Sequence, residues 1–205
     1  RGTLSRAVVL EAAVRIADSE GLAALTMRRL GVELSVEAMS LYNHVSNKED
    51  LQRALVNSVW GNVDLAADES VWRAGLHRLC GSAFRSMLSH PWFFQLPVTY
   101  GGEARLAVIN ATLAHLAHGG VGKDASFHAL HVLDGYVYGY AWQAAGFADM
   151  DSLMAGADAR LAQLDADALP HLLEHAHQHL HSVPEGDGFT VGLDLILDGL
   201  ERVKS

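Results

Sequence analysis

The chain has 205 residues, a length that suits one large domain or two small ones and is enough to bury a core without disulfides. Its single cysteine, Cys80, excludes an intrachain disulfide scaffold and is typical of a reducing compartment, so we expect a cytoplasmic protein. No apolar run approaches the roughly 18 residues of a membrane span, and no secretory signal is recognisable, so we expect a soluble protein without a membrane partner.

The net charge of −9 is unevenly distributed along the chain. Residues 1–63 hold seven Lys or Arg and seven Asp or Glu, whereas residues 64–205 hold eight and seventeen. A neutral N-terminal part would let a few cations meet phosphate while the acidic remainder is repelled from DNA. The composition therefore permits selective nucleic-acid binding without demonstrating it.

The first third of the chain predicts helices and no strand. A helical stripe of apolar residues lies between Ser5, a candidate N-cap, and Gly21, a typical helix stop. Thr26 is placed to cap a short second helix that ends at Leu34, and a third short helix is expected over 37–45.

A long fourth helix is expected to follow, because the spacings Ser46/Glu49 and Asn47/Asp50 both fit a capped helix start. The remaining apolar periods predict further helices over about 71–89, 103–118, 123–146, 169–182 and 188–203. We therefore expect an all-α protein with an N-terminal three-helix domain over 1–46, a connecting helix over 47–63 and a larger helical domain over 64–205.

The second and third helices have the form of a helix-turn-helix, whose second helix can lie in the major groove of DNA. Gly31 supplies a small residue where the two helices cross, Ser35 stands at the turn, and Leu41 provides an apolar anchor. The spacing requirements of this motif are thus partly met.

The segments Thr26 to Leu30 and Val36 to Leu51, with the run Leu-Tyr-Asn-His-Val-Ser-Asn-Lys, resemble the tetracycline-repressor (TetR) family of bacterial regulators. The resemblance extends to the C-terminal domain of the tetracycline-repressor branch, through the apolar helix of residues 130–147 and the terminal helix of residues 189–201. Two departures are Ser35 for the usual turn glycine and Gly31 for the usual alanine, which cost about a few tenths to 1 kcal/mol locally.

The resemblance implies a DNA-binding surface around the third helix. The residues it places toward base edges are Ala38, Met39, Ser40 and Asn43, and Arg28 of the preceding helix is a further candidate for a base or phosphate contact. Those it places on phosphates are Tyr42, His44 and Lys48. The chemistry agrees, since an arginine suits guanine and a lysine at a helix start lies near backbone N–H groups that also suit phosphate. Interhelical packing is the alternative role for Tyr42 and His44, and Arg29 is the alternative to Arg28.

The 123–146 helix is apolar on almost every face, which predicts that it runs through the interior, with Gly135 and Gly139 permitting close neighbours. It would form one wall of a mainly apolar cavity with a few polar residues. The candidate ligand-binding residues are Phe84, Met87, Leu88, Phe94, Tyr100, His131, Asp134, Tyr138 and Trp142. Plain core packing is the alternative for at least half of them.

The aromatic wall predicts a largely planar or hydrophobic organic effector held by one or two hydrogen bonds. The segment that supplies a metal-binding histidine in the tetracycline branch has no match here, since residues 97–101 read Pro-Val-Thr-Tyr-Gly. Tetracycline is therefore not implied, and no cofactor is expected.

The string His171-Leu172-Leu173-Glu174-His175 matches the H-x-x-E-H pattern of inverted zinc proteases, and two histidines four apart on a helix can share a metal. Three more histidines follow by residue 181, so such a string arises by chance here, and no third ligand is singled out. We expect a solvated helical face, no metal site and no enzyme. The alternatives are a metal-responsive regulator or a metal-dependent enzyme that uses the 171–181 histidines.

The last helix carries an apolar stripe, which in the family joins residues of the preceding helix in a four-helix dimer interface. The expected dimerisation residues are Leu172, Leu173, Leu193, Ile196, Leu197 and Leu200. A homodimer would hold two recognition helices about 34–36 Å apart on a palindromic operator in double-stranded DNA. The sequence thus predicts a ligand-responsive transcriptional regulator, a repressor by its resemblance, that a small organic molecule releases from its operator.

Overall fold

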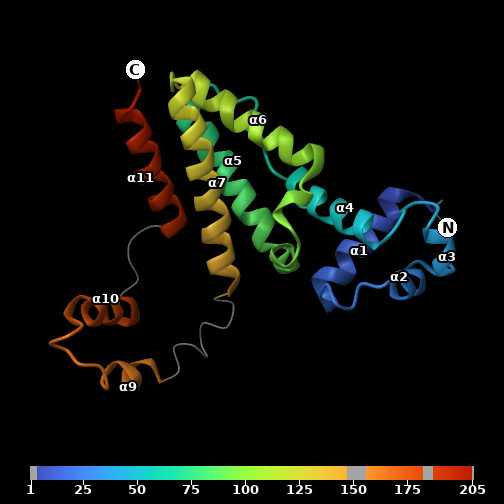
Figure 1. The fold of residues 1–205 in the computed structure, drawn as a ribbon, viewed down its shortest axis with the longest axis horizontal. Helices are drawn as coiled ribbons and strands as arrows, with labels where there is room; N and C mark the ends of the chain where they lie inside the picture. The colour runs from blue at the N-terminus through green and yellow to red at the C-terminus, as the bar shows by residue number, and fades with distance from the viewer. Residues whose placement is uncertain (1–3, 147–155, 182–186, 205) are drawn as a thin grey trace.

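The computed structural model describes residues 4–146, 156–181 and 187–204, and within these ranges it contains helices and no strand (Figure 1). The helices are α1 (Arg6–Glu20), α2 (Met27–Leu34), α3 (Ala38–Leu41), α4 (Lys48–Gly61), α5 (Trp72–Leu88), α6 (Gly102–His118), α7 (Lys123–Gly146), α9 (Ala157–Leu161), α10 (Pro170–His181) and α11 (Gly188–Arg202). Two 3₁₀ helices, η1 (Pro91–Gln95) and η2 (Val98–Tyr100), lie between α5 and α6. The predicted all-α fold is confirmed. None of the helices in the described ranges is long and apolar enough to span a bilayer.

Helices α1 to α3 form a head at one end of the molecule, drawn in blue in Figure 1. The Ser5 hydroxyl accepts a 3.3 Å hydrogen bond from the Val8 N–H and so caps α1, which ends at Gly21 with φ +83°. The Thr26 hydroxyl accepts a 3.1 Å bond from the Arg29 N–H and caps α2. Both predicted N-caps are confirmed.

The crossing of α2 and α3 depends on two residues. A Cβ atom on Gly31 would lie 2.9 Å from the carbonyl oxygen of Val36, so only a residue without a side chain allows this approach undistorted. Ser35 ends α2 in the left-handed region, with φ 54° and ψ 42°. The predicted roles of both residues in the turn are confirmed.

Helix α3 is shorter than the expected 37–45. Beyond Leu41, the N–H groups of Tyr42, Asn43 and His44 bond to carbonyl groups three residues earlier, at 3.2, 3.4 and 2.9 Å. This tighter pattern is that of a 3₁₀ turn, which is common at helix ends.

Helix α4 runs from the head into the rest of the molecule, the body (Figure 1). The Asn47 Oδ1 accepts a 2.8 Å bond from the Asp50 N–H, and the Asp50 Oδ2 accepts a 2.8 Å bond from the Ser46 N–H. The capping pair is therefore Asn47/Asp50, while Glu49 instead pairs with Arg53 at 2.8 Å. Of the two predicted cap spacings, the structure selects one.

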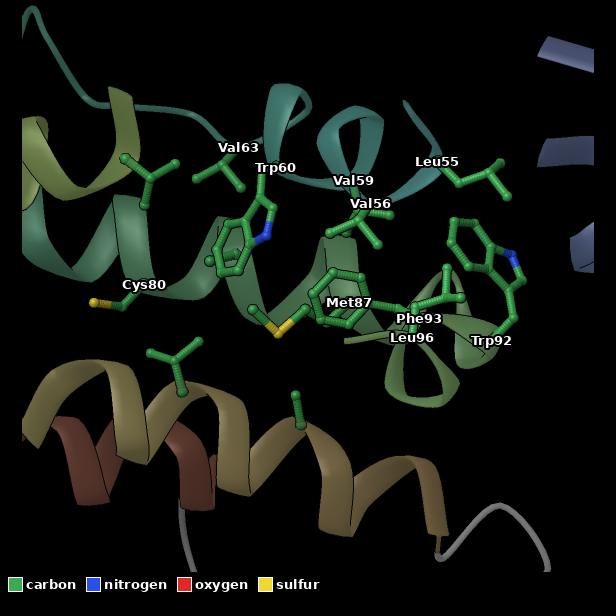
Figure 2. Close-up of a cluster of buried hydrophobic side chains, with 14 of the residues drawn as sticks. Leu55, Val56, Val59, Trp60, Val63, Cys80, Met87, Trp92, Phe93 and Leu96 are labelled. Atoms are coloured by element: carbon green, nitrogen blue, oxygen red, sulfur yellow. The ribbon is translucent and has the colours of Figure 1, made fainter. Parts of the chain in front are cut away.

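The body is built from α5, α6 and α7, which pack on one another, and both α5 and α6 also pack on α4. Figure 2 shows Trp60 and Val59 of α4 above Met87 of α5 and Phe93 of η1. The Trp60 and Phe93 rings meet edge to face with centroids 5.8 Å apart. This packing fixes the position of α4 relative to the body.

Helix α7 covers the predicted span, but the other described residues cover only one of its faces. Its buried residues are Ser126, Ala129, Leu133, Val137 and Ala141. Phe127, Val132 and Trp142 are more than half exposed, and a Cβ on Gly135 or Gly139 would meet nothing within 4 Å. The expectation of a fully interior helix with close neighbours at its glycines is wrong for the single chain, because α5, α6 and α11 pack on one side of it.

Helix α11, drawn in red, lies along α7 and α5 (Figure 1). The Phe189 ring stacks on Phe84 with centroids 4.4 Å apart, and the Tyr136 hydroxyl donates a 2.7 Å bond to the Phe189 carbonyl. Arg73 of α5 pairs with Asp198 at 2.7 Å. Helices α9 and α10 stand apart from this bundle in Figure 1.

Candidate nucleic-acid interface and ligand cavity

The predicted DNA-contacting residues lie on the outer surface of the head. Met39 is 73% and Tyr42 44% exposed. Arg28, Asn43 and Lys48 are exposed as well, and Ala38, Ser40 and His44 are half-buried. Leu41 and Val45, which alternate with them in the sequence, are buried in the head. The polar face of the motif is thus separated from its apolar anchors.

The two neighbouring arginines of α2 have different surroundings. Arg29 pairs with Glu20 at 2.6 Å and with Glu33 at 2.9 Å, and these carboxylates raise the pKa of its guanidinium above the ordinary value, Glu20 most strongly. Arg28 is exposed and makes no ion pair with any residue that the structure describes. Arg28 is therefore available to an external anion, whereas Arg29 is held by the head itself.

An arginine that the sequence reasoning missed organises the base of this surface. Arg6 donates to both carboxylate oxygens of Asp50, at 2.6 and 2.9 Å, and to the carbonyl oxygen of His44 at 2.8 Å. The bonds from Arg6 to the carboxylate, together with the bond from the N–H of Ser46, lower the pKa of Asp50 to about 2. No local signal could have found a pair 44 residues apart, because only the fold brings α1 to the start of α4.

A cavity of about 380 Å³ lies in the body between α4, α5, η2, α6 and α7. Its lining residues are Trp60, Leu79, Cys80, Ala83, Met87, Val98, Arg105, Val108, Thr112, Leu133, Asp134, Gly135, Val137 and Tyr138. The walls are mainly apolar, and the two charged residues in this lining, Arg105 and Asp134, form an ion pair with each other. Such a cavity suits a largely apolar small molecule with a few polar contacts.

The polar groups of the cavity are arranged around Trp60. The guanidinium carbon of Arg105 lies 4.3 Å from the centroid of the Trp60 ring. The Nε1 of Trp60 is buried and has no hydrogen-bond partner among the described residues. Burial, and secondarily the charge of Asp134, raise the pKa of the Cys80 thiol to about 12, so this thiol stays neutral. The arrangement is suited to binding rather than to nucleophilic chemistry.

Three of the nine predicted ligand-binding residues line this cavity, namely Met87, Asp134 and Tyr138. Phe84 points instead to α11, where it stacks on Phe189. His131 and Trp142 lie on the exposed face of α7 and do not reach the cavity. None of these three side chains lines the cavity: Phe84 faces α11, and His131 and Trp142 lie on the face of α7 that the other described helices leave open.

The remaining predicted lining residues, Leu88, Phe94 and Tyr100, are not part of the lining either. Phe94 packs edge to face on Tyr138 at 5.5 Å, and Tyr100 lies under the guanidinium of Arg53 at 4.3 Å. Leu88 is half-buried at the end of α5. The sequence reasoning missed Trp60, Arg105 and Thr112, which come from α4 and α6 and meet α7 only in the folded chain.

The predicted dimerisation stripe of α11 is largely covered within the chain. Leu193 and Leu197 are fully buried and Leu200 is 9% exposed, because they face α5 and α7. The exposed apolar residues of this helix are Val191 and Leu195, at 49% and 69%. On α10, Leu172 is 48% exposed and Leu173 half-buried, and Ile196 of α11 is also half-buried.

The histidines of α10 provide no metal site in the part of the chain that the structure describes, where no three His, Cys, Asp or Glu side chains lie close enough to hold an ion. His171, His175 and His177 are exposed. The side chains of His179 and His181 are outside the part of the chain that the structure describes.

Comparison with known proteins gives matches along the whole chain. The model "Bacterial regulatory proteins, tetR family" matches residues 9–55, and "Tetracyclin repressor-like, C-terminal domain" matches residues 66–204. The HTH-type transcriptional repressor DrrR1 of Streptomyces coeruleorubidus is 30% identical over 212 residues, covering 97% of this chain and 78% of that protein.

Solved structures agree with these matches. A TetR transcriptional regulator from Streptomyces coelicolor is 25% identical with a TM-score of 0.85, covering 99% of this chain and 100% of that one. ActR from Streptomyces coelicolor, in complex with actinorhodin, is 25% identical with a TM-score of 0.81, covering 98% of this chain and 96% of that one.

Proposed function

Because the chain belongs to the TetR family of bacterial transcriptional regulators, we propose that it is a repressor that leaves its DNA operator when a small organic molecule occupies the cavity beside α7. One observation carries the ligand response: α4 lines the cavity through Trp60 and begins with Lys48 on the surface of the head. A molecule in the cavity therefore contacts the same rigid helix that positions the candidate DNA-binding surface.

The DNA contacts we propose are those of the exposed head surface. Arg28, Ser40 of α3 and Asn43 of the turn after α3 contact base edges, and Lys48 contacts phosphate. The exposure of Arg28, Asn43 and Lys48 and the pairing of Arg29 within the head support this assignment. Phosphate contacts position the protein, whereas base contacts carry sequence preference.

The mechanism is a shift between two conformations. In the DNA-binding conformation, the head is oriented so that α3 enters the major groove. The ligand binds more tightly to a second conformation, in which α4 has moved with its contacts in the cavity and the head is displaced. A ligand shifts the equilibrium only by the difference between its affinities for the two conformations.

We propose that the working form is a homodimer on a palindromic operator. Large apolar side chains of α10 and α11 are exposed in the single chain, namely Leu172, Val191 and Leu195. Covering such residues removes apolar surface from water and stabilises an assembly. The dimer would act in the cytoplasm, where the operator lies, and without catalysis.

Selection of bound sequences from random double-stranded DNA, followed by a screen of small molecules for release, tests this function. The variant Ala83→Leu would fill the cavity, since Ala83 is buried in its wall. It should bind the selected operator as the wild type does. Its release from the operator should require at least about tenfold more of the compound found in the screen, on the scale of a lost apolar contact.

The control is Ala117→Leu, the same enlargement at an exposed position of α6. It should respond to the compound as the wild type does. Failure of the wild type to enrich any DNA sequence would contradict the DNA-binding role. An unchanged response in Ala83→Leu would place the ligand elsewhere.

A further inference from the structure

The ion pair in the cavity joins two helices, and its two side chains differ in their exposure to solvent. Arg105 comes from α6 and Asp134 from α7. The Arg105 side chain is 15% exposed, whereas that of Asp134 is 43% exposed. Asp134 can therefore regain water if it leaves the pair, but Arg105 would remain a poorly hydrated cation and would need another anion.

Contacts other than Asp134 also hold the Arg105 guanidinium in place. It lies over the Trp60 ring at 4.3 Å, an arrangement that favours a cation. A Cβ on Gly101 would lie 2.5 Å from the Arg105 Cβ, so the stem of this side chain packs directly on backbone. Arg105 is thus oriented by α4 and by the segment after η2, and the loss of Asp134 would leave it in position.

We propose that the effector is an aromatic acid whose carboxylate binds Arg105 in place of Asp134. This inference rests on the proposed function, because it concerns the same cavity. The exchange replaces one anion by another, so Arg105 stays paired, and a carboxylate offers two oxygens to a guanidinium. The buried Nε1 of Trp60, a donor without a described partner beside Arg105, gives the second oxygen a further target.

The rest of the effector is defined by the apolar wall. Leu79, Met87, Val108 and Leu133 line the cavity and suit a fused ring system. A cationic ligand could pair with Asp134 only by leaving the poorly hydrated Arg105 cation beside it without an anion. A neutral ligand would gain burial of apolar surface without the charge-assisted bonds.

The exchange also explains how the ligand acts on the helices. The Arg105–Asp134 pair links α6 to α7 in the empty cavity. When the carboxylate takes over Arg105, this link is lost, while the contact between Arg105 and Trp60 of α4 is kept. Occupancy of the cavity is thereby coupled to the helix that leads to the head.

Calorimetric titration of the full chain with naphthalene-2-carboxylate and with naphthalene-2-carboxamide tests the inference. These probes share one ring system and differ in charge. The carboxylate should bind about ten- to hundredfold more tightly than the carboxamide, the range expected for hydrogen bonds to a charged group. Arg105→Met should remove this difference, with its fold checked by thermal melting.

Asp134→Asn gives the sharper test, because it removes the competing anion. It should raise the affinity for naphthalene-2-carboxylate by about two- to fivefold, on the scale of a partly exposed ion pair, and leave the carboxamide unchanged. Asp124→Asn, at an exposed position in the first turn of the same helix, is the matched control and should change neither affinity.

Absence of saturable carboxylate binding, equal affinities for the two probes, or weaker carboxylate binding by Asp134→Asn would each overturn the inference. The last outcome would show that Asp134 itself holds the ligand. The proposed function fails on a different observation, the lack of a selected operator. If the protein binds an operator but prefers the carboxamide, the proposed function stands and the inference that the effector is an acid is wrong.

Discussion

The Nε1 of Trp92 donates a 2.6 Å hydrogen bond to Oδ1 of Asp18, which joins the last part of α1 in the head to η1 in the body. The Nδ1 of His90 lies 2.8 Å from the same oxygen. Because Trp92 is 2% exposed, water does not replace this acceptor if it is removed. The head is therefore attached to the body by this contact as well as by α4.

We predict that Asp18→Ala lowers the free energy of unfolding by about 1–3 kcal/mol, the cost of leaving a buried donor without an acceptor. Urea denaturation followed by circular dichroism measures the change. Glu11→Ala removes a carboxylate from the exposed side of the same helix and should cost far less. Equal losses in the two variants would show that the Trp92 bond contributes nothing specific.

Lys48→Ala should weaken binding to all DNA sequences alike, because Lys48 is an exposed cation at the first position of α4. The slope of log affinity against log salt should become shallower by about one phosphate contact. Fluorescence anisotropy over a salt series gives both quantities. Lys123→Ala, at the first position of α7, should leave the slope unchanged; a similar change there would indicate a general charge effect.

Leu195→Glu and Leu197→Glu should have different consequences although they lie two residues apart. Leu195 is 69% exposed, so its substitution should dissociate the proposed dimer and leave the monomer folded. Leu197 is fully buried against α5 and α7, so a charge there should destabilise the chain itself by several kcal/mol, about 3–5. Sedimentation velocity and thermal melting separate the two effects. An intact Leu195→Glu dimer would place the interface on another surface.

Protonation of Asp50 should contribute to the loss of folding stability at acid pH. Its pKa is lowered from 3.8 to about 2 in the folded chain, chiefly by Arg6, so the folded state favours the ionised carboxylate. The stabilisation is complete above about pH 3.8 and is lost as the pH falls toward 2.

Asp50→Asn should therefore be less stable than the wild type at neutral pH, by about 1 kcal/mol, and the difference should shrink below pH 4. Unfolding by urea at several pH values checks this. Asp124→Asn provides the comparison at an exposed helix start. A difference that stays constant down to pH 2 would rule out the charge of Asp50 as its cause.

Helix order and the motif could be predicted from the sequence because their determinants are local. Thr26 and Asn47 cap helices through bonds to residues three positions away, and Ser35 and Gly31 act within one turn. The end of α3 could not be predicted, since the choice between α-helical and 3₁₀ bonds after Leu41 depends on small differences in energy.

The cavity is a different case, because its polar centre joins elements far apart in the chain. Trp60, Arg105 and Asp134 come from α4, α6 and α7, and no periodicity of a single helix places them together. Phe84 and Met87 lie three residues apart on α5, yet one packs on α11 and the other lines the cavity. The sequence shows that both are apolar, and only the neighbouring helices determine what each one contacts.

Helix α11 shows most clearly which features the sequence determined and which the tertiary structure determined. Its sequence alone determined that α11 is amphipathic and that Leu193, Leu197 and Leu200 leave water. Whether the same chain or a second copy covers them was decided by the tertiary structure, which packs them on α5 and α7 and leaves Leu195 outside. The physical reason is that the hydrophobic effect is non-directional: burial of an apolar stripe is favourable against any complementary surface, so the sequence cannot specify which one covers it.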